Sequence, residues 1–240
     1  MTQKFIKKIF RSLGMEVHRY TANASPTAQI VSALNYFQID LILDIGANQG
    51  QFASEIRSGG FSGEIVSFEP LSAAHSTLQS VAENDAKWRV HPRCALGDYD
   101  GEIEINIAGN SVSSSILPML ESHKIAAPLS VYQGREVTNI RALDTVAKEY
   151  CTAEHRPFLK VDTQGFEWQV LNGARETLPH VRGILLELTL SPLYEGQHLW
   201  RETVDRLEAE GFMLWALLPG FTDPVNGQTF QVDGIFFRAP

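Results

Sequence analysis

A charged pair inside an otherwise apolar strand constrains this chain more than any other feature. In residues 158–174, FLKVDTQGFEWQVLNGA, Lys160 and Asp162 stand two positions apart in a segment that has the pattern of a buried strand. Strand alternation places both on one face and Leu159 and Val161 on the other. Because removing a charge from water is costly unless the charge is paired or exposed, the two charges need a compensating arrangement at the end of this strand.

The residues that follow this strand predict a turn and then a helix. Gly165 permits a tight turn, and Phe166, Val170, Leu171 and Ala174 have the spacing of one helical face. A strand that ends in a carboxylate and turns into a helix is where open α/β sheets bind ligands. The segment therefore predicts a ligand site, although it does not define the chemistry of that site.

The composition is that of a globular protein with a sizeable core. The chain has 240 residues, of which 44% are hydrophobic and 20% charged, and these are ordinary values. A net charge of -8 argues against a nucleic-acid partner, because broad nucleic-acid binding needs a basic surface. Two cysteines, Cys94 and Cys151, favour a reduced, cytoplasmic protein. We expect no membrane span, since no apolar run is long enough, and no signal peptide, because the N-terminal basic residues are interleaved with apolar ones.

Residues 1–40 precede the main pattern and are expected to form a helical extension. Within residues 4–13, apolar and basic positions alternate with helical spacing. One face would carry Phe5, Ile6, Ile9, Phe10 and Leu13, and the other Lys4, Lys7, Lys8 and Arg11. Such a helix could pack on its own domain or on a second subunit, giving a homo-oligomer, or make a peripheral contact with an anionic membrane. The sequence favours packing, because amphipathic helices are common and four basic residues are few.

From residue 41 onward, strand and helix patterns alternate, which is typical of an α/β fold. We expect one domain over residues 41–240. Its strands are expected at 41–45, 64–68, 88–91, 101–107, 137–141, 157–162, 183–188, 212–218 and 230–237. The strand at 101–107 should be a half-exposed edge, because its isoleucines alternate with polar residues. The irregular segment 109–136 is expected to be a lid or a binding segment, since so long a connection inside a compact domain is usually functional.

The loop after the first strand, DIGANQG at 44–50, indicates a cofactor site. Glycine lets a ligand approach the backbone, and the following helix offers free N–H groups. A dinucleotide fingerprint would need glycine where the chain has Asn48 and Gln51, which argues against an NAD-dependent oxidoreductase. A loop opened by an acid, Asp44, suits a cofactor with a positive centre and no phosphate, such as S-adenosylmethionine. Glu69, at the end of the second strand, could accept hydrogen bonds from both ribose hydroxyls. Alternatively, Asp44 could cap a turn and Glu69 could be an ordinary loop acid.

Several ordered segments resemble the FkbM family of S-adenosylmethionine-dependent methyltransferases over residues 41–238. They are LILDIGANQGQFA, IVSFEPL, CALGDYDGEIEI, SSSIL, ALDTV, FLKVDTQGFEWQVLNGA, and ILLEL with PLYEG. The resemblance implies an α/β, Rossmann-like class I methyltransferase fold, with a doubly wound seven-stranded sheet and an antiparallel C-terminal hairpin. It also implies O-methyl transfer to a hydroxyl of a small metabolite, a sugar or glycan, or a polyketide-like acceptor.

The same resemblance implies roles for particular residues. The methionine part of the cofactor would be lined by Asp44, Gly46, Asn48 and Gly50. Glu69 would take the ribose, and Ala95 with Asp98 would lie beside the adenine. Asp162 would face the transferring methyl group, and Ser115 of the serine cluster would reach the same pocket.

A hydroxyl acceptor must lose its proton, so we expect a general base. Asp162 is the first candidate and Glu187, in ILLEL, the second. Lys160 would keep Asp162 ionised, because a nearby cation lowers the pKa of a carboxyl group. Alternatively, Lys160 forms an internal ion pair with Asp162 or Glu187 and has no part in proton transfer. The two carboxylates could also hold Mg²⁺ as a Lewis acid, although no third ligand is evident.

Two other functions are compatible with this fold. An RNA 2′-O-methyltransferase could use a Lys/Asp/Lys/Glu set that Lys160, Asp162 and Glu187 partly resemble, but the acidic balance counts against it. A non-catalytic cofactor-binding protein should lack one of the two strand-end motifs, and this chain has both.

Overall fold

The structure, a computed structural model, describes residues 3–239, with the side chains of residues 3, 4, 6 and 9 outside the described part. The helices are α1 (Gln3–Ser12), α2 (Pro26–Tyr36), α3 (Gln51–Ser58), α4 (Ser72–Ala82), α5 (Glu121–Ala126), α6 (Leu143–Ala147), α7 (Glu167–Asn172) and α8 (Trp200–Ala209). The strands are β1 (Leu41–Ile45), β2 (Glu64–Phe68), β3 (Trp88–Val90), β4 (Ala95–Gly97), β5 (Gly101–Ala108), β6 (Tyr132–Ala142), β7 (Pro157–Val161), β8 (Gly183–Thr189), β9 (Phe212–Pro219) and β10 (Gln231–Arg238).

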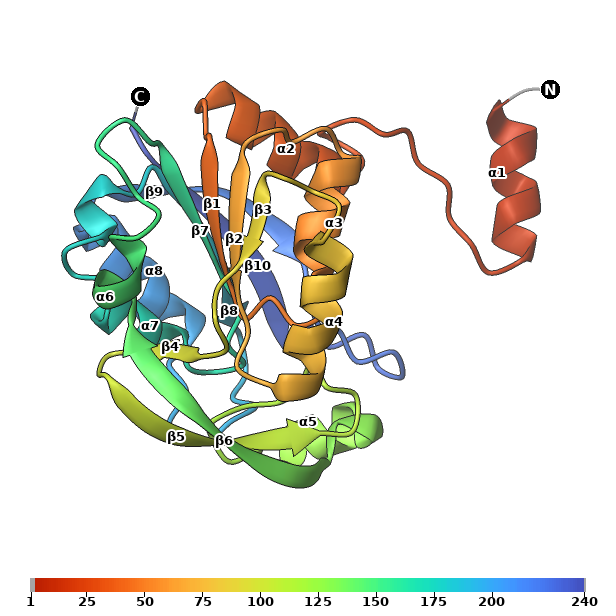
Figure 1. The fold of residues 1–240 in the computed structure, drawn as a ribbon. Coiled ribbons are helices and arrows are strands. Elements are labelled where there is room, and N and C mark those ends of the chain that lie inside the picture. Colours follow the sequence, from red (N-terminus) through yellow and green to blue (C-terminus); the bar gives the residue numbers. More distant parts are fainter. Residues whose placement is uncertain (1–2, 240) are drawn as a thin grey trace.

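The main sheet has seven strands in the order β3-β2-β1-β7-β8-β10-β9. The first five are parallel, whereas β10 runs antiparallel to both β8 and β9. Helices cover both faces: α2, α3 and α4 on one, and α6, α7 and α8 on the other (Figure 1). This confirms the predicted doubly wound sheet with an antiparallel terminal hairpin.

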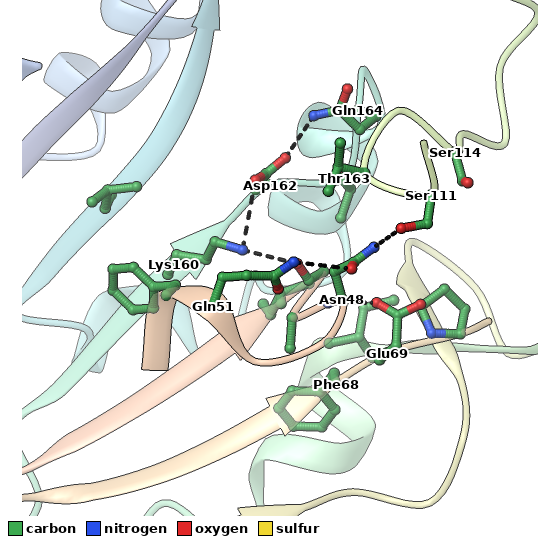
Figure 2. A pocket seen from close by; sticks show the side chains of 18 of the residues that line it. Asn48, Gln51, Phe68, Glu69, Ser111, Ser114, Lys160, Asp162, Thr163 and Gln164 are labelled. Carbon is green, nitrogen blue, oxygen red and sulfur yellow. Dashed lines mark hydrogen bonds and ion pairs between the residues drawn. The ribbon is translucent and has the colours of Figure 1, made fainter. Parts of the chain in front are cut away.

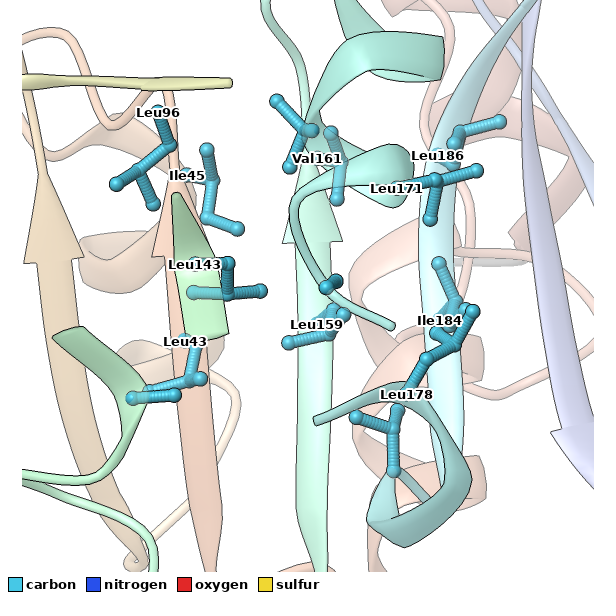
Figure 3. Packing of buried hydrophobic residues seen from close by; sticks show 14 of the residues in the cluster. Leu43, Ile45, Leu96, Leu143, Leu159, Val161, Leu171, Leu178, Ile184 and Leu186 are labelled. Carbon is cyan, nitrogen blue, oxygen red and sulfur yellow. The ribbon is translucent and has the colours of Figure 1, made fainter. Parts of the chain in front are cut away.

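The centre of the sheet explains the alternation in the sequence. Leu159 and Val161 of β7 are fully buried on the face that also carries Leu43 of β1 and Leu171 of α7 (Figure 3). Lys160, between them, points to the other face, as the pattern predicted. The apolar packing on one side fixes the register of β7, and this register brings the charged residues to one edge of the sheet.

A second sheet, in the order β4-β6-β5, lies beside the carboxyl ends of the main strands (Figure 1). The half-exposed edge strand was predicted correctly, since β5 is the outer strand and only Ile105 of its isoleucines is buried. Strand β6 is longer than expected, because it pairs along the whole of β5, from Gly101 opposite Ile140 to Ala108 opposite Tyr132.

The N-terminal residues divide into two parts. Helix α2 belongs to the core, with Ile30, Val31 and Leu34 buried against α3 and the sheet. Helix α1 stands apart from the domain (Figure 1), with Phe5 51% and Leu13 65% exposed. Of the two packings expected for α1, the one on its own domain is not present, and packing on a second subunit stays a prediction. The side chains of Lys4, Ile6 and Ile9 of the predicted faces lie outside the described residues. No helix in the described chain is long and apolar enough to cross a membrane.

Candidate active site

A cavity of about 440 Å³ opens at the carboxyl ends of β1, β2 and β7 (Figure 2). Its walls come from the loop after β1, the end of β2, strand β4, the serine segment at 111–116 and the turn after β7. Its size falls within the range of small-molecule sites, which is about 300–1,000 Å³. The strand-end location predicted from the sequence is therefore where the cavity lies.

The loop after β1 needs glycine at its first position. Gly46 has φ +74°, and a Cβ atom there would lie 1.9 Å from the backbone oxygen of Asp162. Lys160 Nζ donates to the Gly46 carbonyl oxygen at 2.9 Å. Gly46 and Asn48 both line the cavity, as predicted. This close packing fixes the loop against the end of β7.

Lys160 lines the cavity and lies between two carboxylates. Its Nζ is 3.3 Å from Asp44 Oδ1 and 3.7 Å from Asp162 Oδ2. Burial alone would lower the pKa of Lys160, but these two carboxylates hold it above its ordinary value, so the ammonium stays charged. The sequence proposed Asp162 or Glu187 as the ion-pair partner, whereas Asp44 is the nearer one.

Asp44 has a different place from the one expected. It is fully buried and is not among the residues that line the cavity. Its Oδ2 accepts a hydrogen bond from Ser67 Oγ at 3.0 Å. The sheet register places Asp44 beside Ser67 of β2 and Lys160 of β7, and its carboxylate contacts these two side chains and does not line the cavity.

Glu69 presents a buried carboxylate to the cavity, as the sequence predicted. Its Oε2 accepts from the Asn48 backbone N–H and its Oε1 from that of Leu71, both at 2.8 Å. Burial raises the pKa of Glu69 to about 7, against the opposing effect of these two donors. Each carboxylate oxygen has a second lone pair, so Glu69 can accept further hydrogen bonds from a ligand.

One side-chain amide connects the two candidate bases. Gln164 Nε2 donates to Asp162 Oδ1 at 2.8 Å and to Glu187 Oε2 at 3.2 Å. Asp162 lines the cavity, but Glu187 does not. Burial, together with the nearby carboxylates of Asp162, Glu167 and Asp233, raises the pKa of Glu187 well above its ordinary value. Because Asp162 reaches the cavity and Glu187 does not, the geometry favours Asp162 over Glu187 as the base.

Gln164 is also held by the serine segment and by Tyr194. Its Oε1 accepts from Tyr194 Oη at 2.9 Å, and its backbone oxygen accepts from Ser115 Oγ at 2.6 Å. Ser115 lines the cavity, but its hydroxyl is already engaged, because it also accepts from the Leu117 backbone N–H at 3.0 Å. Gln164 has φ +53°, a conformation uncommon for a residue other than glycine. These contacts hold the turn after β7 in one shape.

Asp98 and Gly50, which were expected at the cofactor, do not line the cavity. Ala95 does line it, together with Leu96 of β4. Strand β4 ends at Gly97, and Asp98 is exposed just beyond that end. A Cβ atom on Gly50 would meet Trp88 and Leu78 at 2.9–3.0 Å, so this glycine packs on the core. We correct both placements accordingly.

Asp233 of β10 is a cavity residue that sequence reasoning missed. It lines the cavity, and burial and the nearby Asp162 raise its pKa to about 6. In the sheet it stands opposite Glu187. An acid inside the apolar closing strand, QVDGIFF, is the signal that could have identified it. Gln164, the other missed residue, carries no comparable signal, because glutamine is common in turns and loops.

Within residues 3–239, no three His, Cys, Asp or Glu side chains gather in an arrangement that could hold a metal ion. Asp162 and Glu187, the pair considered for Mg²⁺, are bridged by the Gln164 amide. We therefore assign no step to Mg²⁺.

Comparison with known proteins shows the family of this chain. The model of the methyltransferase FkbM domain matches residues 44–214. The 2-O-methyltransferase NoeI of Sinorhizobium fredii is 28% identical over 222 residues, covering 89% of this chain and 88% of that protein. The methyltransferase sdnD of Sordaria araneosa is 27% identical over 168 residues, covering 61% of this chain and 65% of the relative.

A solved structure shares the fold. The crystal structure of a proposed O-methyltransferase from Klebsiella pneumoniae superposes with a TM-score of 0.52 at 10% identity, covering 99% of this chain and 89% of the other. Family and fold thus agree with the strand-end cavity. This chain belongs to the FkbM family of S-adenosylmethionine-dependent methyltransferases.

Proposed function

We propose that this enzyme transfers a methyl group from S-adenosylmethionine to a hydroxyl oxygen of a small metabolite, a sugar or glycan, or a polyketide-like acceptor. The observation that carries the proposal is the placement of Glu69 and Asp162. These two carboxylates come from the ends of β2 and β7 and line one cavity, on either side of the Gly46 loop.

The cavity fits the chemistry of the cofactor. S-adenosylmethionine supplies a methyl group activated by its sulfonium, together with ribose hydroxyls that donate hydrogen bonds. Glu69 is buried, aims its carboxylate into the cavity and has lone pairs left to accept from the ribose. The loop at Gly46 and Asn48 would hold the methionine part, and Ala95 with Leu96 provides an apolar wall for the adenine.

Asp162 is the general base in this proposal. Its side chain is 39% exposed at the cavity, and the Gln164 amide orients one oxygen while the Lys160 charge lies near the other. A base held in hydrogen-bond reach of the acceptor contributes about 10²- to 10⁴-fold to the rate. In the competing interpretation, Asp162 is only an ion-pair partner of Lys160 and has no proton to move.

The acceptor would enter at the end of the cavity formed by Leu185, Leu218 and Asp233. The printed name of the relative NoeI, a 2-O-methyltransferase, supports an oxygen atom as the acceptor. Lys160 is the only lysine or arginine among the described lining residues, and its ammonium is already paired with Asp44 and Asp162, which disfavours an RNA acceptor.

The test is methyl transfer itself. Purified enzyme and S-adenosylmethionine labelled in the methyl group are incubated with panels of glycans, polyketides and small hydroxylated metabolites, and with RNA. We expect label in a hydroxylated acceptor and none in RNA. Label only in RNA, or only in amines or carbons, would overturn the proposed acceptor class.

A further inference from the structure

Helix α1 has a two-faced sequence pattern that its own domain does not use. By sequence spacing, Phe5, Phe10 and Leu13 share one face with two isoleucines, and the opposite face is basic. Figure 1 shows the helix separate from the domain, and Phe5 and Leu13 are about half or more exposed. Lys7 and Lys8 are exposed as well. An apolar stripe left in water is unfavourable unless something covers it.

Charge is strongly segregated along the chain. Residues 1–15 contain four basic residues and no acidic one, whereas the chain as a whole has 20 basic and 28 acidic residues. Residues 16–240 therefore carry 16 basic and 28 acidic residues, a net charge of -12. An anionic surface would attract the first segment and repel the rest, so only α1 would lie on it.

We propose that α1 docks this protein on an anionic lipid bilayer, lying in the plane of the surface. The apolar face would enter the boundary between head groups and acyl chains, and the lysines would contact lipid phosphates. A protein partner would have to offer an apolar floor with an acidic rim, whereas an anionic bilayer offers both without a special shape.

The position of α1 relative to the cavity is consistent with docking. Residues 13–25 connect α1 to α2, and Pro26, Thr27 and Ile30 at the start of α2 line the cavity. Thirteen residues span at most about 45 Å when fully extended. A docked helix would therefore keep the cavity within that distance of the bilayer.

The test is flotation of the full chain with phosphatidylcholine vesicles that contain or lack phosphatidylglycerol. We expect binding only to the anionic vesicles, and release at 1 M salt, where the screening length falls to about 3 Å. The double variant Lys7→Gln/Lys8→Gln should lower the partition coefficient about tenfold or more. Phe10→Ser/Leu13→Ser should lower it as well, because the apolar face would be lost.

A matched control removes the same charge elsewhere. Lys124→Gln/Lys148→Gln changes two domain lysines and should bind vesicles like the parent. Because α1 stands apart, the α1 variants should keep the thermal unfolding curve of the parent, and the control should stay close to it because both of its lysines form exposed ion pairs. Equal loss of binding in the control, or no vesicle binding by the parent, would overturn the proposal. A dimer seen by light scattering that Leu13→Ser dissociates, without vesicle binding, would assign the helix to a second copy of the chain instead.

Discussion

Lys160 on β7 and Asp44 on β1 stand directly opposite each other in neighbouring parallel strands, with Nζ and Oδ1 3.3 Å apart. Both side chains are at most 7% exposed. Lys160 lines the cavity and also donates to the Gly46 carbonyl oxygen, which joins the end of β7 to the loop after β1. Lys160 and Asp162, the charged pair that the sequence placed within one strand, thus form a three-residue arrangement with Asp44 of the neighbouring strand.

We expect Asp44→Asn to act mainly on stability. Removing one partner of a buried ion pair typically costs about 3–5 kcal/mol, and Asp44→Asn should fall at the lower end because Lys160 keeps Asp162 at 3.7 Å. Urea unfolding should show a loss of that order for Asp44→Asn and for Lys160→Gln. The double variant should lose less than the two single losses together, because both members of the buried pair are gone and only Asp162, which is 39% exposed, loses its partner. Additive losses would contradict a direct Asp44–Lys160 interaction.

Glu69 should make stability depend on pH. Its pKa is about 7 in the folded protein against an ordinary value of 4.5, so between these values the folded state binds more protons than the unfolded state. This contribution lowers the free energy of unfolding as pH rises from about 4.5 to about 7. Glu69→Gln removes that dependence on pH. It also removes one backbone hydrogen bond, and the stability lost with this bond does not vary with pH. The difference in unfolding free energy between variant and parent should therefore shift in favour of the variant across this range.

The control for this measurement is Glu102→Gln, which removes an exposed carboxyl group on β5. A flat difference between Glu69→Gln and the parent over the same range would mean that Glu69 keeps no proton in the folded enzyme.

Gln164 should act as a positioning residue for Asp162. Gln164→Asn keeps an amide and tolerates positive φ, but it is too short to reach Asp162 Oδ1. We expect kcat to fall about tenfold to a hundredfold, since small misplacements of reacting groups have effects of this size. The Kd for S-adenosylhomocysteine should stay near that of the parent. Gln133→Asn, at an exposed position of β6, is the control, and an unchanged kcat for Gln164→Asn would show that Asp162 is oriented without it.

Asp162→Asn separates a catalytic from a structural role. The change keeps the shape and an acceptor oxygen for Gln164, but it removes the proton acceptor. We expect turnover to fall at least about a hundredfold while cofactor binding stays close to normal. Full activity in single-turnover assays would reduce Asp162 to an ion-pair partner of Lys160.

The sequence predicted the fold well because its signals are local. Alternation in residues 158–162 and the acids at the strand ends were sufficient to indicate a site at this edge of the sheet and to name Glu69 and Asp162, and the family resemblance added Asn48; all three line the cavity. Asp44 was placed incorrectly because its partner depends on strand register, which the sequence does not display. Register alone decides that the fourth residue of β1 faces the fourth of β7.

Other details depend on where the chain turns. Asp98 follows a strand that ends one residue earlier, so it leaves the cavity wall. Gln164 enters the site through a left-handed backbone conformation, and Asp233 through an antiparallel strand from the far end of the chain. Neither the left-handed conformation at Gln164 nor the pairing of β10 with β8 produces a periodic pattern in the sequence.

Calorimetric titration of the enzyme with S-adenosylhomocysteine tests the cofactor site most directly. We expect micromolar binding by the parent, at least about tenfold weaker binding by Glu69→Gln because the ribose loses its carboxylate partner, and no binding of NAD. Binding of NAD, or equal affinity of the parent and Glu69→Gln for S-adenosylhomocysteine, would contradict the assignment of this cavity and of Glu69 to the cofactor.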